Sequence, residues 1–296
     1  MILNQLKTIA LLGVLSAMLV GIGGALGPSF LWLFAIVAVA MNLGAYFFSD
    51  KLVLRMSGAR EVSPAEAPAL HRMVDELARA AELPKPRVYV TPEAQPNAFA
   101  TGRNPANGVV AVTQGLMQVL TERELRGVLA HELAHIKNRD ILVSSVAAMF
   151  ATAVSSIANA IGYAAMFGGS SSDEDEGGGS MAGGLLLSFL APIAASLVQF
   201  GISRSREYMA DETGARISGD PEALASALEK LQLSAQRIPA HPAPATASMY
   251  IVNPFSAFGS RMLSLFSTHP PMEERVRRLR QLAGASHGER PAYRAF

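Results

Sequence analysis

The chain of 296 residues contains no cysteine. That absence excludes disulfides and thiolate metal sites, so any metal must be bound by His, Asp and Glu side chains. Charge is also scarce, because only 17% of the residues are Asp, Glu, Lys or Arg, against about a quarter in soluble proteins. Half of the residues are hydrophobic. These proportions indicate a membrane protein.

Uncharged stretches locate the first membrane segments. Residues 8–49 carry no charge, which is long enough for two helical crossings of about 20 residues each. Gly27-Pro28-Ser29 supplies a turn between them. We therefore predict a transmembrane hairpin in residues 1–50, with spans at about 8–26 and 30–48. A cleaved secretory signal is not indicated, because a second apolar span follows the first at once.

Two further apolar runs, near residues 141–167 and 181–203, flank the acidic segment SSSDEDEGGGS at residues 170–180. A segment of this composition cannot form a core, so we predict a flexible, exposed connector. Both runs are long enough to cross a membrane, which predicts a second transmembrane hairpin over residues 141–203. Their many small residues leave a buried hairpin of a soluble domain as the alternative.

Positive charge is confined to two blocks. Residues 51–140 hold twelve Lys and Arg, residues 204–296 hold another twelve, and the connectors between the spans hold none. Basic loops remain on the cytoplasmic side of a membrane. We therefore expect a multi-pass protein whose termini and basic blocks all lie in the cytoplasm.

The first basic block shows mixed secondary structure. Ser63-Pro64-Ala65-Glu66 is a capping box with proline at the first helical position, and it predicts a helix through Ala81. Three short strand-like runs follow, bounded by Pro, Asn or Gly: residues 87–91, 98–101 and 109–113. They predict a small antiparallel sheet. Thr121-Glu122-Arg123-Glu124 is a second capping box, which opens another helix.

The second basic block is predicted to be helical at three places: residues 204–218, 221–233 and 272–282. The expected fold is therefore a mainly α membrane protein. It has four transmembrane helices and a cytoplasmic α+β domain made of residues 51–140 and 204–296.

The helix after the second capping box carries His131-Glu132-Leu133-Ala134-His135. Residues four apart share a helix face, so both imidazoles can point at one position. In this arrangement two histidines hold Zn²⁺ and the glutamate acts as general base. The alternative is a surface helix with solvated histidines.

A catalytic zinc ion requires a third protein ligand. Glu207 and Asp211 share a helix face by the same spacing. We predict that Glu207 binds the metal and that Asp211 accepts the second N–H of a ligating histidine. An antiparallel hairpin of spans would return Glu207 to the membrane surface near His135. An ordinary solvated helix start is the alternative.

Four motifs carry a resemblance to a known family: HELAH, NAFATG at 97–102, SRSREYMAD at 203–211 and STHPPMEERV at 267–276. Together they resemble the HtpX family of bacterial membrane zinc metalloproteases, related more distantly to the eukaryotic CAAX prenyl proteases. The likeness covers essentially the whole chain, including four hydrophobic segments in the same order. The acidic connector is not part of this likeness.

The resemblance implies a zincin-type protease domain that binds one Zn²⁺, with His131, His135 and Glu207 as ligands and Glu132 as catalytic base. It also implies a site on the cytoplasmic face of the bacterial inner membrane. The expected activity is a stress-response endopeptidase that cuts damaged or misassembled membrane proteins. Protein substrates and the lipid bilayer are the expected partners, and homo-oligomerisation is left open.

Other site residues are less specified. A strand at the edge of a sheet can hold an extended substrate through main-chain hydrogen bonds. The alternative is that the candidate strand lies inside the sheet. The candidate edge residues are Asn97, Ala98, Phe99 and Ala100. A developing oxyanion needs a second donor besides the metal. The candidates are Arg204, Tyr208 and His269.

Two other functions compete with this interpretation. One is a membrane scaffold with a structural zinc site, and the other is a prenyl-protein processing protease. A basic cluster near the C-terminus could suggest nucleic acid, but in a juxtamembrane protein attraction to anionic lipid heads is the simpler use. The cluster consists of Arg275, Arg277, Arg278 and Arg280. We therefore expect no nucleic-acid partner.

Overall fold

The computed structural model describes residues 27–146, 204–237, 251 and 270–288, with scattered helical positions between residues 9 and 24. Most of the predicted second hairpin, its acidic connector and His269 lie outside the described residues. The elements in chain order are α2 (Pro28–Met56), β1 (Arg60–Glu61), α3 (Pro68–Ala80), β2 (Arg87–Thr91), β3 (Ala98–Thr101), η1 (Pro105–Asn107), β4 (Val109–Thr113), α4 (Gln114–Val119), α5 (Glu122–Lys137), α8 (Arg204–Ser218), α9 (Pro221–Arg237) and α11 (Met272–Gly288).

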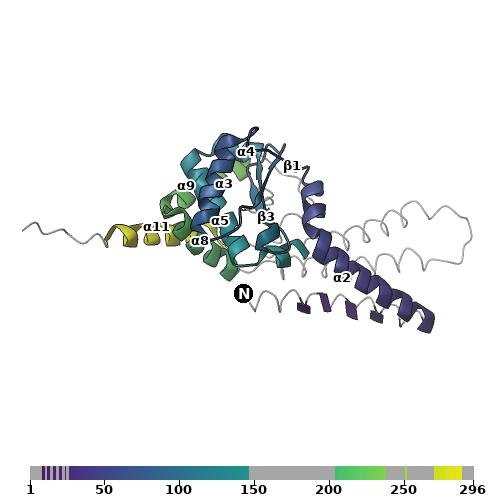
Figure 1. Cartoon of the computed structure of the whole chain (residues 1–296). Helices are drawn as coiled ribbons and strands as arrows, with labels where there is room; N and C mark the ends of the chain where they lie inside the picture. Colours follow the sequence, from purple (N-terminus) through teal and green to yellow (C-terminus); the bar gives the residue numbers. More distant parts are fainter. Residues whose placement is uncertain are drawn as a thin grey trace, which may run out of the picture.

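Helix α2 is long and apolar enough to cross a membrane, and among the described residues it is the one such helix. It projects from the rest of the molecule (Figure 1). Large apolar side chains are exposed along it, including Trp32 at 72% and Ile36 at 68%. The helix contains the predicted span at about 30–48 and continues past Lys51 to Met56. Its last turns contact the sheet, which extends the helix beyond the apolar span.

The sheet has four strands in the order β1-β2-β4-β3. The prediction of an antiparallel sheet is wrong, because β2 and β4 pair in parallel while the two outer pairings are antiparallel. The physical reason is the chain path. After β2 the chain passes to β3 at the far edge and then returns through η1, so that β4 inserts between them and runs in the direction of β2. Strand β1 has two residues, too few for a periodic pattern.

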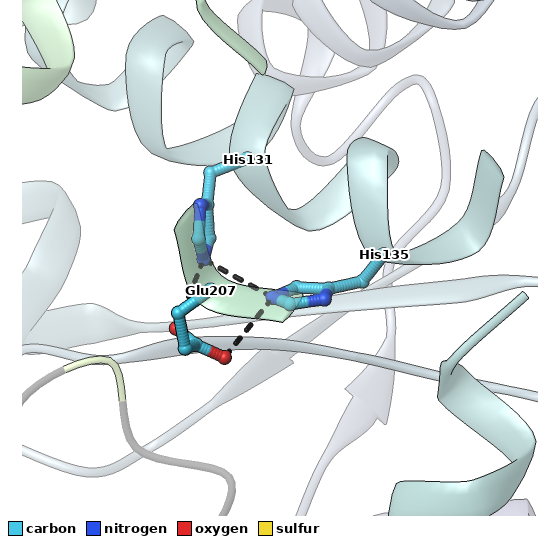
Figure 2. A group of neighbouring side chains, drawn as sticks. All are labelled: His131, His135 and Glu207. Carbon is cyan, nitrogen blue, oxygen red and sulfur yellow. Dashed lines mark hydrogen bonds and ion pairs between the residues drawn. The ribbon is translucent and has the colours of Figure 1, made fainter. Parts of the chain in front are cut away.

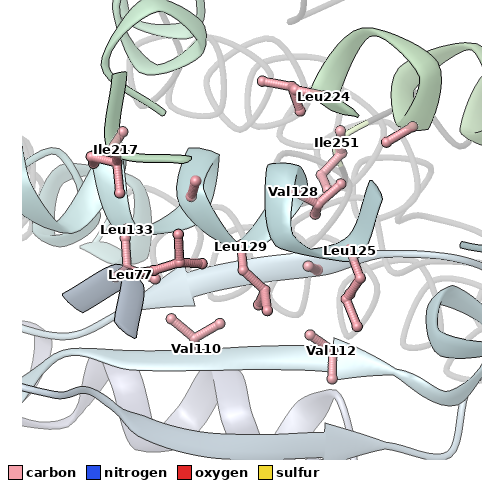
Figure 3. Packing of buried hydrophobic residues seen from close by; sticks show 14 of the residues in the cluster. Leu77, Val110, Val112, Leu125, Val128, Leu129, Leu133, Ile217, Leu224 and Ile251 are labelled. Atoms are coloured by element: carbon pink, nitrogen blue, oxygen red, sulfur yellow. The ribbon is translucent and has the colours of Figure 1, made fainter. Parts of the chain in front are cut away.

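Helix α5 lies at the centre of the domain. One face of the sheet packs against it, with Val110 and Val112 facing Leu125 and Leu129 (Figure 3). On its other side α5 packs against α8 and α9. Most of its side chains are therefore buried. Each large apolar side chain that is fully covered contributes about 1.5–3 kcal/mol to the stability of the fold. The helix that carries the histidines is a core helix.

The opposite face of the sheet packs against the end of α2. Val53 and Leu54 form a small cluster with Phe99, Val109 and Ala111. Phe99 belongs to β3, so helix α2 contacts this strand directly. The domain is thus a sheet with α5 on one side and the end of α2 on the other.

The two predicted capping boxes behave differently. Ser63 and Glu66 exchange the expected hydrogen bonds, at 2.7 and 3.3 Å, but α3 begins only at Pro68. A residue before proline is disfavoured in the helical region, and Ala67 has φ −135° and ψ 63°. The box therefore closes an isolated turn. At Thr121 both reciprocal bonds form and α5 starts as predicted.

Candidate metal centre

The three predicted metal ligands converge from two helices. His131 and His135 come from successive turns of α5, and Glu207 comes from the first turn of α8 (Figure 2). The two Nε2 atoms lie 3.1 Å apart. Glu207 Oε2 lies 3.8 Å from Nε2 of His131, and its Oε1 lies 3.7 Å from Nε2 of His135. Tetrahedral zinc with bonds of about 2.0–2.1 Å keeps its ligand atoms about 3.3–3.4 Å apart. The observed spacings fit such an ion.

Each imidazole is held by a carboxylate behind it. Asp211 Oδ1 lies 3.0 Å from Nδ1 of His131, as the sequence predicts. Asp140 Oδ2 lies 3.1 Å from Nδ1 of His135, a contact that sequence reasoning missed. A carboxylate behind Nδ1 favours the tautomer with its proton there, which leaves the Nε2 lone pairs facing each other. A cation between them removes that repulsion.

Asp140 reaches His135 because of the way α5 ends. Arg139 adopts the left-handed conformation with φ 58°, and the chain turns back on the last helical turn. The Asp140 N–H then donates to the carbonyl oxygen of His135 at 3.2 Å. Asp140 is 2% exposed. An aspartate five residues after the second histidine, past the helix end, is the sequence signal that could have identified it.

The buried charges of the centre also fit a divalent cation. Four carboxylates and two guanidinium groups are buried here, each at most 7% exposed. They belong to Glu132, Asp140, Glu207, Asp211, Arg206 and Arg275. With neutral imidazoles and ionised carboxylates, these groups of the described residues sum to a net charge of −2. Because an unpaired buried charge is costly, this residue set suits an ion of charge +2.

Burial and neighbouring charges shift the pKa values of three groups in the centre. Burial alone would lower the pKa of His135, but the surrounding carboxylates, above all Asp140, outweigh it and raise that pKa to about 10. Burial raises the pKa of Glu132, even though the adjacent imidazoles oppose the change. Burial would likewise raise the pKa of Asp211, but Arg275 outweighs burial and lowers it. The centre attracts positive charge.

Close packing of two helices brings Glu207 to the histidines. Gly214 of α8 sits against α5, and a Cβ atom there would lie 2.9 Å from both Cα and N of His131. No side chain larger than hydrogen fits without moving one helix. Sequence reasoning did not single out Gly214, because an isolated glycine in a helix shows only a low helix propensity.

Of the predicted substrate-edge residues, Ala100 contacts the centre. Strand β3 is the last strand of the described sheet on that side. The Ala100 N–H donates to the carboxylate of Glu132. Asn97 is 3% exposed, and its side-chain oxygen accepts a hydrogen bond from the Ile251 N–H at 3.1 Å. Its side chain thus binds a residue that is distant in the sequence.

The three oxyanion candidates are in different situations. The Arg278 guanidinium carbon lies 3.9 Å from the centre of the Tyr208 ring. Arg204 is exposed at the start of α8, and His269 is outside the described residues. A role for any of them stays a prediction.

One of the four arginines of the basic cluster does not fit the expected lipid-facing surface, and attraction of the other three to lipid heads stays a prediction. Arg275 is completely buried within the metal centre, because it lies on the inner face of α11. The other three arginines form ion pairs: Arg277 and Arg278 with Glu274, and Arg280 with Glu222 and Glu229.

A histidine pair on one helix and a glutamate from a second helix define a zinc metallopeptidase centre of the zincin class. Residues 64–283 match the sequence pattern of Peptidase family M48. The chain belongs to this family and is a zinc metalloprotease, with His131, His135 and Glu207 as its zinc site.

Several relatives within the family are HtpX proteases. A protease HtpX homologue of Syntrophobacter fumaroxidans is 56% identical over 282 residues, which cover 94% of this chain and 99% of the relative. One from Pelotomaculum thermopropionicum is 53% identical, covering 95% and 100%. The crystal structure of S. mikatae Ste24p aligns with a TM-score of 0.49 at 19% identity, over 94% of this chain and 66% of that one. The family match and the HtpX relatives confirm the predicted family, and together with the grouping of His131, His135 and Glu207 they confirm the predicted cofactor.

Proposed function

We propose that this metalloprotease is an endopeptidase that cleaves damaged or misfolded membrane proteins at the cytoplasmic face of the bacterial inner membrane. The observation that carries the proposal is the position of Glu132, which is buried beside the zinc-binding residues and accepts a hydrogen bond from the Ala100 N–H of β3, the outermost strand of the described sheet. That position places a proton acceptor between a metal centre and a strand that can bind an extended chain.

Glu132 is proposed as the catalytic base. Burial raises the pKa of its carboxyl, so it takes up a proton more readily than an exposed glutamate. A base with a raised pKa can remove a proton from an attacking water and return it to the leaving amine. The bound zinc ion would supply Lewis acidity, which acidifies water and polarises the scissile carbonyl. Asp140 and Asp211 hold the imidazoles in the required orientation.

Strand β3 is proposed to bind the substrate backbone. The Thr113 N–H donates to the carbonyl oxygen of Asn97 at 2.9 Å, so alternate residues of β3 bond to β4. In an antiparallel pair the residues between them direct their N–H and C=O groups away from the partner. Those residues are Ala98 and Ala100. Ala98 is fully buried and the Ala100 N–H already donates to Glu132, so the Ala100 carbonyl oxygen is the group proposed to pair with the substrate backbone. Main-chain pairing at this edge would select extended segments with little sequence preference, which suits misfolded substrates.

The position of β3 supports membrane proteins as substrates. Phe99 packs on Val53 and Leu54 of α2, two to three residues beyond Lys51. At a rise of about 1.5 Å per helical residue, this contact lies within about 5 Å, along the axis of α2, of the first basic residue after the apolar span. On the other side Thr101 Oγ1 hydrogen-bonds Ser145 Oγ at 2.7 Å, at the start of the predicted third span. The substrate edge is thus tied to both membrane-directed segments.

The organisation of the whole chain forms part of the proposal. Four spans would divide it into a first hairpin at 1–50, a cytoplasmic half at 51–140, a second hairpin at 141–203 and a second cytoplasmic half at 204–296. Family membership removes the scaffold alternative, since the chain is a metalloprotease. No described feature favours a prenylated substrate over other membrane proteins.

The test compares wild type with Glu132→Gln, purified in detergent. Both proteins are expected to bind one zinc ion, whereas casein digestion is expected only for the wild type and to stop with a chelator. Glu229→Gln, an exposed glutamate of α9, is the matched control and should remain active. Proteolysis by Glu132→Gln would refute the assigned base. To test the substrate class, the cleavage rate of a destabilised membrane protein is compared with that of its stable parent. The destabilised protein should be cut faster, and equal cleavage rates would contradict a role in quality control.

A further inference from the structure

Helix α11 places a completely buried arginine in the metal centre. Arg275 is 0% exposed. Its Nε donates to Asp211 Oδ2 at 2.8 Å, and its Nη2 donates to Asp211 Oδ1 at 2.7 Å. This is a bidentate pair, in which the planar guanidinium fixes the plane and position of the carboxylate.

The same guanidinium contacts the third zinc ligand and a distant loop residue. Its Nη1 lies 3.7 Å from Glu207 Oε2. Nη1 also donates to the carbonyl oxygen of Ile251 at 3.4 Å, and Asn97 holds the N–H of that residue from the other side. Arg275 therefore has a fixed place between α8 and Ile251.

Contacts continue from Arg275 to the imidazole ring of a zinc-binding histidine. Asp211 Oδ1, which accepts from Arg275, also lies 3.0 Å from Nδ1 of His131. The carboxylate can orient that ring only while its own position is fixed. Asp211 and Glu207 are four residues apart on one helix face, where like charges repel. A positive charge between them offsets the repulsion.

We propose that Arg275 is a positioning residue for zinc. It holds the carboxylates of Asp211 and Glu207, and through Asp211 it holds the His131 ring, in the arrangement that binds the ion. The zinc centre then requires α11 as well as α5 and α8, although α11 supplies no ligand. The alternative role for Arg275 is purely structural, as an ion pair that attaches α11 to α8.

Zinc affinity separates these roles, because it can be measured without proteolysis. We would titrate the purified full-length protein against a chromophoric chelator. Removal of an outer partner of a metal ligand typically weakens binding by about 10–100-fold, and we expect this loss for Arg275→Met. Arg275→Lys should show a smaller loss, because lysine retains the charge but cannot form two parallel hydrogen bonds. Arg277→Met, at an exposed position of the same helix, should bind zinc as the wild type does.

A double variant covers the case in which Arg275→Met leaves Asp211 unpaired and fails to fold. Asp211→Leu combined with Arg275→Met removes both buried charges, and such replacements are often tolerated. We expect it to fold but to bind zinc about 10–100-fold more weakly than wild type, because His131 has lost its oriented acceptor. The proposal would be overturned if Arg275→Met lowered Tm but bound zinc normally, or if the double variant bound zinc like wild type.

Discussion

Replacement of Gly214 by alanine tests whether the contact between α5 and α8 sets the zinc geometry. The new Cβ would lie 2.9 Å from Cα of His131. Non-bonded carbon atoms prefer separations of about 3.5–4.0 Å, so the helices must separate locally by roughly 0.6–1 Å. Metal-ligand distances are specified to within about 0.2 Å. The separation therefore exceeds what the centre tolerates, because Glu207 and Asp211 move with α8.

Two effects on stability oppose each other in Gly214→Ala. Overpacking costs about 1–3 kcal/mol, while alanine in a helix interior gains about 1 kcal/mol over glycine. We expect a net loss of up to about 2 kcal/mol and a zinc affinity at least about tenfold lower, which corresponds to about 1.4 kcal/mol. Chemical denaturation of the metal-free protein and chelator competition measure the two quantities.

Two glycines provide controls for this prediction. Nothing lies within 4 Å of a Cβ at Gly284 in α11, so Gly284→Ala should gain up to about 1 kcal/mol and bind zinc normally. At Gly127 a Cβ would lie 2.8 Å from N of Leu224, in α9. Gly127→Ala should lose stability with a smaller effect on zinc, because α9 carries no ligand. If Gly214→Ala behaved like Gly284→Ala, the reasoning would be refuted.

Two further predictions follow from contacts of α5. Asp140→Asn should weaken zinc binding by about 10–100-fold, since a neutral amide orients the His135 ring less strongly, and an unchanged affinity in chelator competition would contradict this role. Burial would raise the pKa of Glu124, but Lys230 and Thr121 outweigh it and lower that pKa below the ordinary 4.5. Ionised Glu124 therefore stabilises the fold above about pH 4.5, and the stabilisation is lost as the pH falls toward the folded-state pKa. The stability difference between wild type and Glu124→Gln, from denaturant titrations, should be present at pH 7 and shrink below pH 4.5; a constant difference would disprove the coupling.

The sequence was sufficient where structure depends on local spacing. The capping box at Thr121 and the four-residue interval between His131 and His135 follow from helix geometry, and the structure shows both. The same interval on α8 identified Glu207 and Asp211. The predicted start of α3 was wrong. The capping box favoured a helix from Ser63, but the residue before Pro68 is disfavoured in the helical region, so the helix begins only at Pro68.

Pairings between distant segments were not predictable from single motifs. Strand β4 inserts between β2 and β3, and the individual strand patterns contain nothing about that order. The apolar composition of α2 predicted a span, but its continuation onto the sheet depends on the cluster around Phe99. Strand patterns and span lengths describe one element at a time.

By itself the sequence determined the zinc-binding residues and the helices that carry them, because helical periodicity is encoded within a few successive residues. Only the tertiary structure decided how the centre is supported: Asp140 after the helix end, Gly214 at the helix contact and Arg275 from α11. These residues act through close packing and buried charge pairing between elements far apart in the chain. Such contacts exist only after the helices have packed, so no local pattern records them.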